Sequence, residues 1–229
     1  MTIVAKSLYK IYRPVALWFW SMMVLVVAAA TAVVARVYEV KFSFWMIIVG
    51  QATKWWLLVI GVLLVATHLK LYVANGITRR DFLAGAGLFG GLTAVAYAAM
   101  VPIGHGVERL LWTAFGTPPA SYPEFSAAEA LREFGHYLPG GLACLVSGAF
   151  IAAGFYRFNW LIGLLLIIPG ALPLLASEGL LGLYAAVEPP APRVLPYAGG
   201  LAVSLALTVL AAAAIRVAMR DVTIRRTAG

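Results

Sequence analysis

The sequence predicts an all-α integral membrane protein with six transmembrane helices, short interfacial helices and both termini in the cytoplasm. Composition is the first reason: 63% of the 229 residues are hydrophobic, only 11% are charged, and the mean hydropathy is +0.93. Soluble domains are closer to half apolar and a quarter charged. The second reason is the placement of the charges, which fall between long apolar segments rather than on one polar face. This placement argues against a nucleic-acid-binding role for the net charge of +8.

Each apolar segment is long enough to cross a bilayer, because about 20 residues at 1.5 Å per residue cover the hydrocarbon core. The predicted spans are residues 15–35, 54–72, 83–103, 138–155, 160–176 and 197–217. We expect residues 1–229 to form a single transmembrane domain around these spans. The segment before the first span, residues 1–13, is basic and has apolar residues at near-helical spacing. This pattern favours either a short amphipathic helix on the cytoplasmic face or a basic tail.

The second span lies in an apolar stretch, residues 43–73, that is longer than one crossing needs. Polar residues at positions 51, 53 and 54 interrupt this stretch. We therefore expect an interfacial helix over residues 44–52, followed by the span. Lys54 is then at the outer interface, where its long side chain can extend to the headgroups or pair with a neighbouring helix end. Glu178, at the end of the fifth span, has the same interpretation.

The longest polar stretch, residues 104–137, follows the third span and is expected on the outer surface. Within it, Ser126 and Glu129 have the spacing of a capping box, which predicts a short amphipathic helix over residues 126–134. The third and fourth spans are rich in glycine, and we expect their small faces to let helices pack closely. Pro169 and Pro173 are expected to break the fifth span, with a role either in helix packing or in a kink.

The basic residues decide the predicted orientation. Most of them lie on one side under this topology: Lys6, Lys10, Arg13, Lys70, Arg79, Arg80, Arg157, Arg216, Arg220, Arg225 and Arg226. Only Asp81 and Asp221 are acidic on that side, whereas the opposite segments are about as acidic as they are basic. The positive-inside rule therefore places this side, with both termini, in the cytoplasm.

No motif for catalysis or nucleotide binding occurs in the sequence. It lacks HExxH, GxSxG and a glycine-rich loop ending in GK[ST], and no span carries paired carboxylates. We therefore predict no enzyme activity and no catalytic, cofactor-binding or metal-binding residues in this chain. His105 and His136 are expected at similar depth, but two ligands without a nearby acid or cysteine cluster make a poor metal site. The single cysteine, Cys144, lies in an apolar run and excludes an internal disulfide.

The densest polar cluster connects the second and third spans, in residues 71–82 (LYVANGITRRDF). Asn75 and Gly76 form a turn dipeptide, because both residue types tolerate a positive φ. Thr78 can cap a new helix, with Asp81 at the capping-box position. The residues expected to bind a partner here are Asn75, Gly76, Thr78, Arg79, Arg80 and Asp81. The alternative is that the two arginines are plain positive-inside anchors, which any membrane protein needs.

Residues 73–82, VANGITRRDF, resemble a turn in the permease subunits of ATP-binding-cassette exporters, in the type-2 exporter class found in actinobacteria. The layout is also similar: an N-terminal interfacial helix, six spans, a longer outer connection and a basic tail. The resemblance implies that this turn is a coupling helix docked on a separate ATPase subunit. It also implies a second permease chain, identical or related. The outer region departs from the family, whose re-entrant hairpin usually lies between the fifth and sixth spans rather than before the fourth.

The expected function is therefore that of a permease subunit of an ATP-driven exporter. We expect a multi-pass protein of the cell membrane whose partners are the lipid bilayer, an ATPase subunit and a second permease chain, with no cofactor of its own. The alternative is a non-transport membrane scaffold or immunity protein, which needs neither protein partner. Co-purification with a nucleotide-binding subunit separates these two functions.

Overall fold

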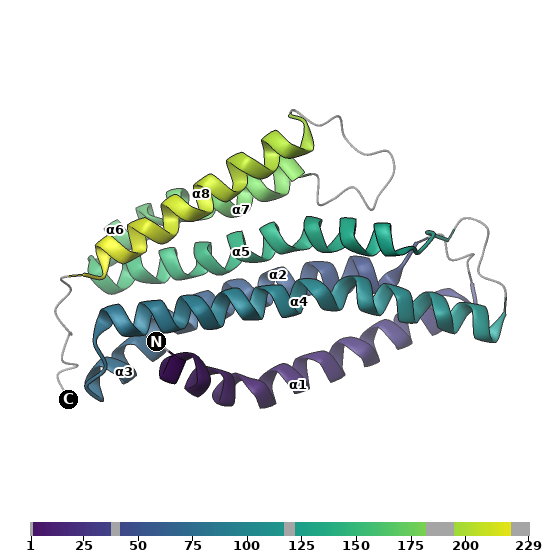
Figure 1. Ribbon diagram of the computed structural model, residues 1–229, viewed down its shortest axis with the longest axis horizontal. Coiled ribbons are helices and arrows are strands. Elements are labelled where there is room, and N and C mark those ends of the chain that lie inside the picture. The colour runs from purple at the N-terminus through teal and green to yellow at the C-terminus, as the bar shows by residue number, and fades with distance from the viewer. Residues whose placement is uncertain (1, 38–41, 117–121, 182–194, 221–229) are drawn as a thin grey trace.

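The structure is a bundle of long helices. It is a computed structural model that describes residues 2–37, 42–116, 122–181 and 195–220. Within these ranges every regular element is helical, and six helices are long and apolar enough to cross a membrane (Figure 1). The chain is therefore a multi-pass membrane protein by the length and composition of its helices.

The helices alternate in direction along the bundle. Their bounds are α1 Thr2–Val34, α2 Phe44–Leu63, the π-helix η1 Leu64–Leu69, α3 Lys70–Ala74, α4 Arg79–Phe115, α5 Ala127–Arg157, α6 Trp160–Leu165, α7 Ile167–Leu181 and α8 Tyr197–Ala218. α2, η1 and α3 follow one another without a gap and form one rod, and α6 and α7 together form another membrane-crossing unit. The longest helix, α4, has 37 residues, which corresponds to about 55 Å.

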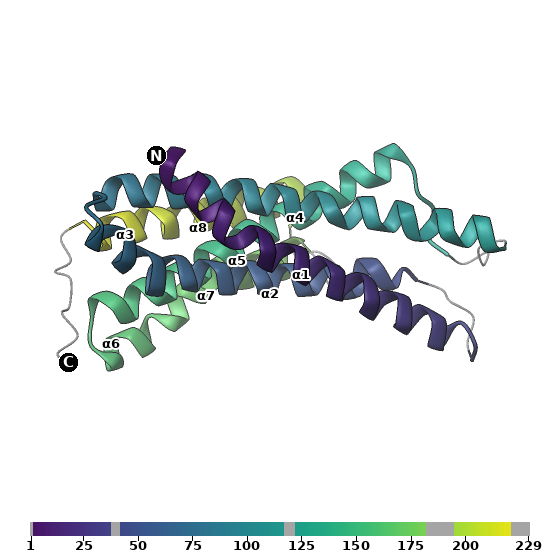
Figure 2. The same ribbon diagram turned by 90° about the horizontal axis from the view of Figure 1, so that it is seen from below.

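α5 lies at the centre of the bundle, in contact with α2, α4, α7 and α8. α1 packs on the side of α2 and α4, and the α7–α8 pair covers the opposite side of α5 (Figure 1, Figure 2). The main core forms where these layers meet, around Leu57, Phe82, Phe89 and Leu145. Cys144 is fully buried in the same core.

The closest backbone approach is between α2 and α5, and two glycines make it possible. A Cβ atom on Gly61 would lie 2.0 Å from the carbonyl oxygen of Leu145, and one on Gly148 would lie 2.1 Å from that of Leu58. The expectation of close packing is thus met on the fourth span. It is not general on the third, because a Cβ on Gly87 or on Gly91 would meet nothing within 4 Å.

Three stretches predicted as separate short helices are instead the first turns of longer ones. Residues 2–13 continue into α1, residues 44–52 continue into the rest of α2, and residues 127–134 begin α5. Gln51, Thr53 and Lys54, which suggested a break, lie within the continuous helix α2. Lys54 is paired with Glu178 inside the bundle. The six crossing helices are consequently longer than the predicted spans.

The fifth crossing breaks where its prolines require it. α6 ends at Leu165 and α7 begins at Ile167. Pro169 has no N–H to donate to the carbonyl of Leu165, and its ring collides with that carbonyl in a regular helix. The predicted break is therefore confirmed beside Pro169, whereas at Pro173 it is wrong because α7 continues through that residue.

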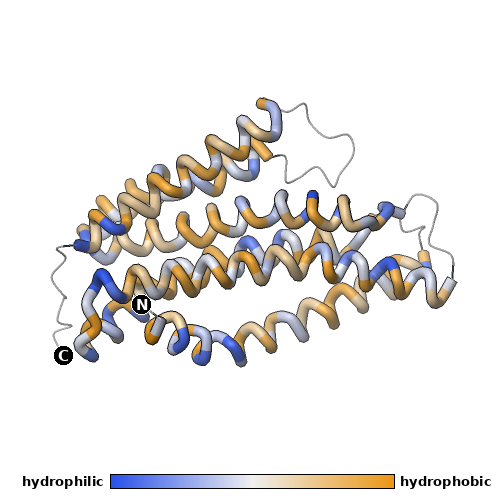
Figure 3. Tube along the Cα trace, in the orientation of Figure 1, coloured by the Kyte–Doolittle hydropathy of each residue, from blue (hydrophilic) through white to orange (hydrophobic). Residues whose placement is uncertain are grey.

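The two ends of the bundle differ in charge. At the end where α1 and α4 begin and where α5 and α8 finish, the described residues include Lys6, Lys10, Lys70, Arg79, Arg80, Arg157, Arg216 and Arg220; we call this the basic end. The opposite end, which we call the acidic end, carries Glu108, Glu124, Glu129 and Glu133 beside Arg36, Arg109 and Arg132, so it lacks the basic excess. Figure 3 shows hydrophobic residues along the whole length between these ends. The cytoplasmic location of the basic end stays a prediction.

Candidate functional site

The turn between α3 and α4, residues 75–81, is rigidly built. Gly76 has φ = 83°, in the left-handed region that glycine adopts without strain. Its N–H donates to the carbonyl of Val73 at 3.1 Å, and the N–H of Ile77 donates to the carbonyl of Tyr72 at 3.1 Å. These two bonds with a left-handed glycine form a Schellman motif, which satisfies the last carbonyls of the preceding helix.

α4 begins directly after this motif with a second cap. The Thr78 hydroxyl accepts from the N–H of Asp81 at 3.1 Å and donates to its carboxylate at 2.7 Å. The predicted cap is confirmed, although the acid bonds to the cap hydroxyl rather than to the cap's own N–H. Asn75 has φ = −91°, so only Gly76 uses the positive φ that both residues tolerate. The Asn75 side-chain amide donates to the carbonyl of Leu71 at 2.8 Å.

Buried side chains on either side hold the turn in place. Phe82 is fully buried, and its ring lies 5.4 Å from that of Tyr72. By contrast, Arg80 and Asp81 are exposed and Arg79 is half-buried. The residues predicted to bind a partner therefore lie together on one hydrogen-bonded turn at the basic end, with Arg79 half-buried and Arg80 exposed.

Sequence reasoning did not foresee the ion pair inside the bundle. Lys54 Nζ of α2 lies 2.5 Å from Glu178 Oε1 of α7, and the two side chains are only 3% and 14% exposed. Both were predicted to extend to the interface or to pair with a helix end. The structure pairs them with each other instead. The available signal was that each is an isolated charge, of opposite sign, at the outer end of a predicted span, where such residues are expensive if they are not paired.

A second buried pair links α4 to α5. His105 Nδ1 lies 2.7 Å from Glu133 Oε1, with side chains 0% and 4% exposed. The ring of His136 stacks on that of Tyr197, with the two centroids 6.4 Å apart. In the part of the chain that the structure describes, no group of three or more His, Cys, Asp or Glu side chains could hold a metal ion.

Glu108 joins the start of α2 to α4. Its carboxylate accepts from the Ser43 hydroxyl and, at 3.4 Å, from the N–H of Trp45. Ser43 is also the N-cap of α2, because its side chain accepts from the N–H of Met46 at 3.1 Å. Burial, followed by the charge of the nearby Glu108, raises the pKa of Tyr122 above its ordinary value. Glu108 and Glu133, two acids that sequence reasoning did not select, are therefore bonded inside this half of the bundle.

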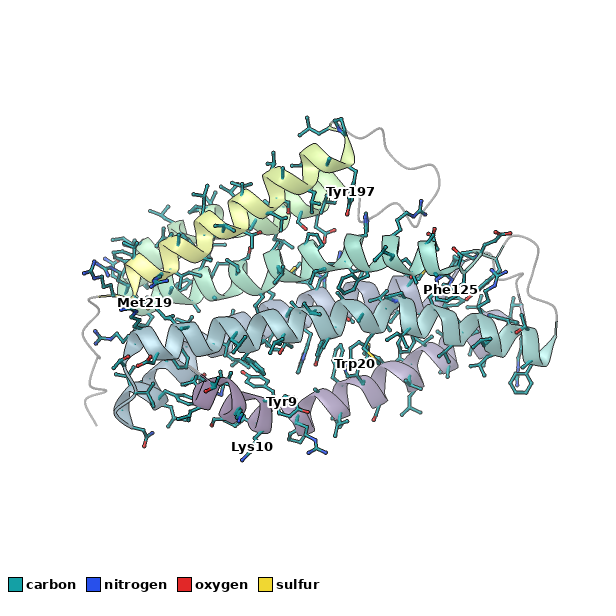
Figure 4. All side chains as sticks on the ribbon, viewed as in Figure 1. Tyr9, Lys10, Trp20, Phe125, Tyr197 and Met219 are labelled. Atoms are coloured by element: carbon teal, nitrogen blue, oxygen red, sulfur yellow. The ribbon has the colours of Figure 1, made fainter. Side chains whose placement is uncertain are left out.

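An apolar cavity of about 760 Å³ lies between α1 and α4 beside Trp45. Trp20 lies between α1 and the layer formed by α2 and α4 (Figure 4). Trp20 stacks on Trp45 at 6.3 Å and contacts Tyr97 at 5.0 Å. Of these rings, that of Trp45 lines the cavity. Phe125 lies toward the acidic end of the bundle (Figure 4).

No protein-family model matches the chain, and no curated protein or solved structure matches it. Its function must accordingly be argued from its own geometry. That geometry offers an exposed, ordered, cationic turn at one end, and buried polar pairs with an apolar cavity toward the other.

Proposed function

We propose that the chain is the membrane-spanning permease subunit of an ATP-driven exporter in the cell membrane. It docks a separate ATP-binding-cassette ATPase through residues 75–81 and pairs with a second permease chain. The observation that carries this proposal is the 75–81 turn, which is exposed, ordered by two helix caps, and cationic. The resemblance of residues 73–82 to the coupling turn of type-2 exporters supports the same function.

A coupling element has to pass a displacement into the membrane, and the elements beside this turn are suited to that task. On one side lies the rod of α2, η1 and α3, 31 residues long, and on the other lies α4, with 37 residues. The Schellman motif ends α3 and the Thr78 cap begins α4, so hydrogen bonds fix the backbone between these two helices. A displacement of the turn is therefore transmitted to both helices and is not lost in a flexible loop.

The energy source must be a partner, because the sequence carries no glycine-rich phosphate-binding loop. The partner surface expected at the turn is acidic, to match Arg79 and Arg80. Truncating a charge at such an interface typically costs about 2–5 kcal/mol of binding. The same truncation on a free surface changes stability by less than about 1 kcal/mol.

The test is the double variant Arg79→Ala/Arg80→Ala, purified from native cells with its partners identified by mass spectrometry. We expect it to insert and fold, but to lose the ATPase subunit or to retain it with ATP hydrolysis no longer stimulated. Arg132→Ala is the control, because it removes an exposed arginine at the acidic end. It should keep the partner.

A second variant disturbs the turn without removing charge. Gly76→Val places a β-branched residue at φ = 83°, where nothing lies within 4 Å, so its effect comes from backbone strain rather than collision. Gly91→Val is the matched control, because Gly91 is helical and also has open space around it. Wild-type ATPase binding and hydrolysis in both turn variants would refute the docking proposal and favour a non-transport scaffold.

A further inference from the structure

The first turns of α1 divide their side chains between two opposite faces. Val4, Leu8 and Tyr12 recur at helical spacing and are buried in the main core. Three cations recur at intervals of four and three residues, and all three are exposed. At about 100° per residue, these cations lie roughly opposite the buried side chains. We call the α1 cationic stripe the residues Lys6, Lys10 and Arg13.

The α1 cationic stripe faces away from the rest of the bundle. α1 is an outer helix, in contact with α2 and α4 (Figure 1, Figure 2). The Lys10 side chain points away from both of these helices (Figure 4). None of the three cations forms an ion pair or a side-chain hydrogen bond with another described residue. Their charges are therefore available to a ligand outside the bundle.

The stripe lies at the depth of the lipid headgroups. Residues 14–35 carry no charged side chain, and their length of about 33 Å is close to the ~30 Å of the hydrocarbon core. Arg13 therefore marks the hydrocarbon boundary at the basic end. Lys10 lies about 4.5 Å and Lys6 about 10.5 Å further along the helix axis, whereas the headgroup layer is roughly 5–8 Å thick. Arg13 and Lys10 are thus within this layer, and the long side chain of Lys6 can extend back to it.

The stripe differs from other cations of the basic end in having no acid near it in the sequence. Arg157 donates to the carbonyl of Ala218, and Arg79 and Arg80 directly precede Asp81. α1, by contrast, contains no acidic residue. A zwitterionic headgroup offsets its phosphate with its own ammonium, whereas an anionic headgroup keeps a net negative charge. The charge of the stripe is therefore complementary to an anionic headgroup.

We propose that the α1 cationic stripe binds the headgroups of anionic phospholipids, such as phosphatidylglycerol, in the leaflet at the basic end. The lipid phosphate accepts charge-assisted hydrogen bonds from the lysine ammonium and arginine guanidinium groups. Tyr9 lies on the same face, between Lys6 and Arg13, and is 61% exposed. Tyrosine favours the headgroup level, so its ring suits the same location. The site belongs to the chain itself and does not depend on the exporter proposal.

The test measures lipid affinity of the full-length chain in detergent by native mass spectrometry. Phosphatidylglycerol and phosphatidylcholine with identical acyl chains are titrated separately, at low and at high ammonium acetate concentration. We expect the wild type to prefer phosphatidylglycerol at least about tenfold at low salt. High salt should reduce this preference, because it screens exposed charges. Lys6→Gln/Lys10→Gln should lower the preference at least about fivefold, which is the effect of one cation near an anionic membrane surface.

Two further variants separate the stripe from the net charge of the chain. Arg36→Gln/Arg132→Gln removes two exposed cations at the acidic end and should leave the preference unchanged. Lys10→Ile/Ile11→Lys keeps the net charge but moves one cation about 100° around the helix, to a position that is 44% exposed. This exchange should lower the preference about fivefold, as the loss of one stripe cation does.

Three results would overturn the proposal. The first is an equal loss of preference in the Arg36→Gln/Arg132→Gln variant, and the second is an unchanged preference in the exchange variant; either would show an effect of net charge alone. The third is loss of a co-purifying protein from the Lys6→Gln/Lys10→Gln variant in native cells while its lipid preference stays intact. That result would assign the stripe to a protein partner instead.

Discussion

Breaking the Lys54–Glu178 pair should strongly destabilise the bundle. Each side chain is almost removed from solvent, with exposures of 3% and 14%, and the two charged atoms are 2.5 Å apart. Replacing either one leaves the other charge buried, which typically costs about 3–5 kcal/mol. That is a large part of the roughly 5–15 kcal/mol that holds a folded protein together. We expect Lys54→Met and Glu178→Gln each to show a loss of this size.

The same chain provides the control pair. Glu129 and Arg132 also form an ion pair, at 2.6 Å, but the arginine side chain is 79% exposed. Such surface pairs are worth about 0.2–1 kcal/mol. Arg132→Met and Glu129→Gln should therefore cost under about 1 kcal/mol each, measured by equilibrium unfolding in mixed micelles with far-ultraviolet circular dichroism as the signal.

The double variant Lys54→Met/Glu178→Met completes a thermodynamic cycle. Because it removes both charges together, it leaves no unpaired charge behind and should be more stable than the sum of the single losses predicts. We expect a coupling energy of about 2–3 kcal/mol between the two positions. Additive losses, or single losses no larger than those of the Glu129–Arg132 pair, would refute the reasoning that burial makes this pair essential.

Three further outcomes follow from local geometry. Gly148→Ala should lower the free energy of unfolding by about 2–3 kcal/mol, since its Cβ meets backbone at 2.1 Å, whereas Gly91→Ala, with open space, should be neutral in the same assay. Ser126→Ala removes the N-cap of α5 and should cost about 1 kcal/mol in a thermal melt, while Ser126→Asn should retain stability. Burial and the charge of Glu108 raise the pKa of Tyr122, so the stability that its neutral phenol contributes is present below pH 10 and is lost at higher pH. Tyr122→Phe should therefore lose less stability than the wild type in this alkaline range. Identical pH profiles of stability for the two proteins would contradict this prediction.

The structural features that depend on residues close together in the sequence could be predicted from the sequence. Six apolar runs near 20 residues leave little alternative to six crossing helices. The 75–81 turn was equally accessible, because a left-handed glycine and a Thr-x-x-Asp cap are properties of neighbouring residues. The cap at Ser126 was predictable for the same reason.

The structural features that could not be predicted depend on contacts between residues that are far apart in the sequence. Lys54 suggested a helix break only because its partner is 124 positions away in the sequence, and nothing local shows that the charge is neutralised inside the bundle. The pairing of His105 with Glu133 is likewise set by how α4 and α5 pack. The role of each glycine depends on which helix faces it, so Gly148 is essential for packing whereas Gly91 is not.

The glycine contact between α2 and α5 also constrains the order in which the protein can be assembled. Gly61 and Gly148 are about 90 residues apart, and a ribosome adds roughly 5–20 residues per second. α2 therefore resides in the membrane for roughly 5–20 s before its closest neighbour has been synthesised. During that interval the small face of α2 is occupied by lipid, or by helices of the insertion machinery, and these must leave when α5 arrives. The contact between α2 and α5 can therefore form only after α5 has been inserted, whereas α1, α2 and α4 can already contact one another before that.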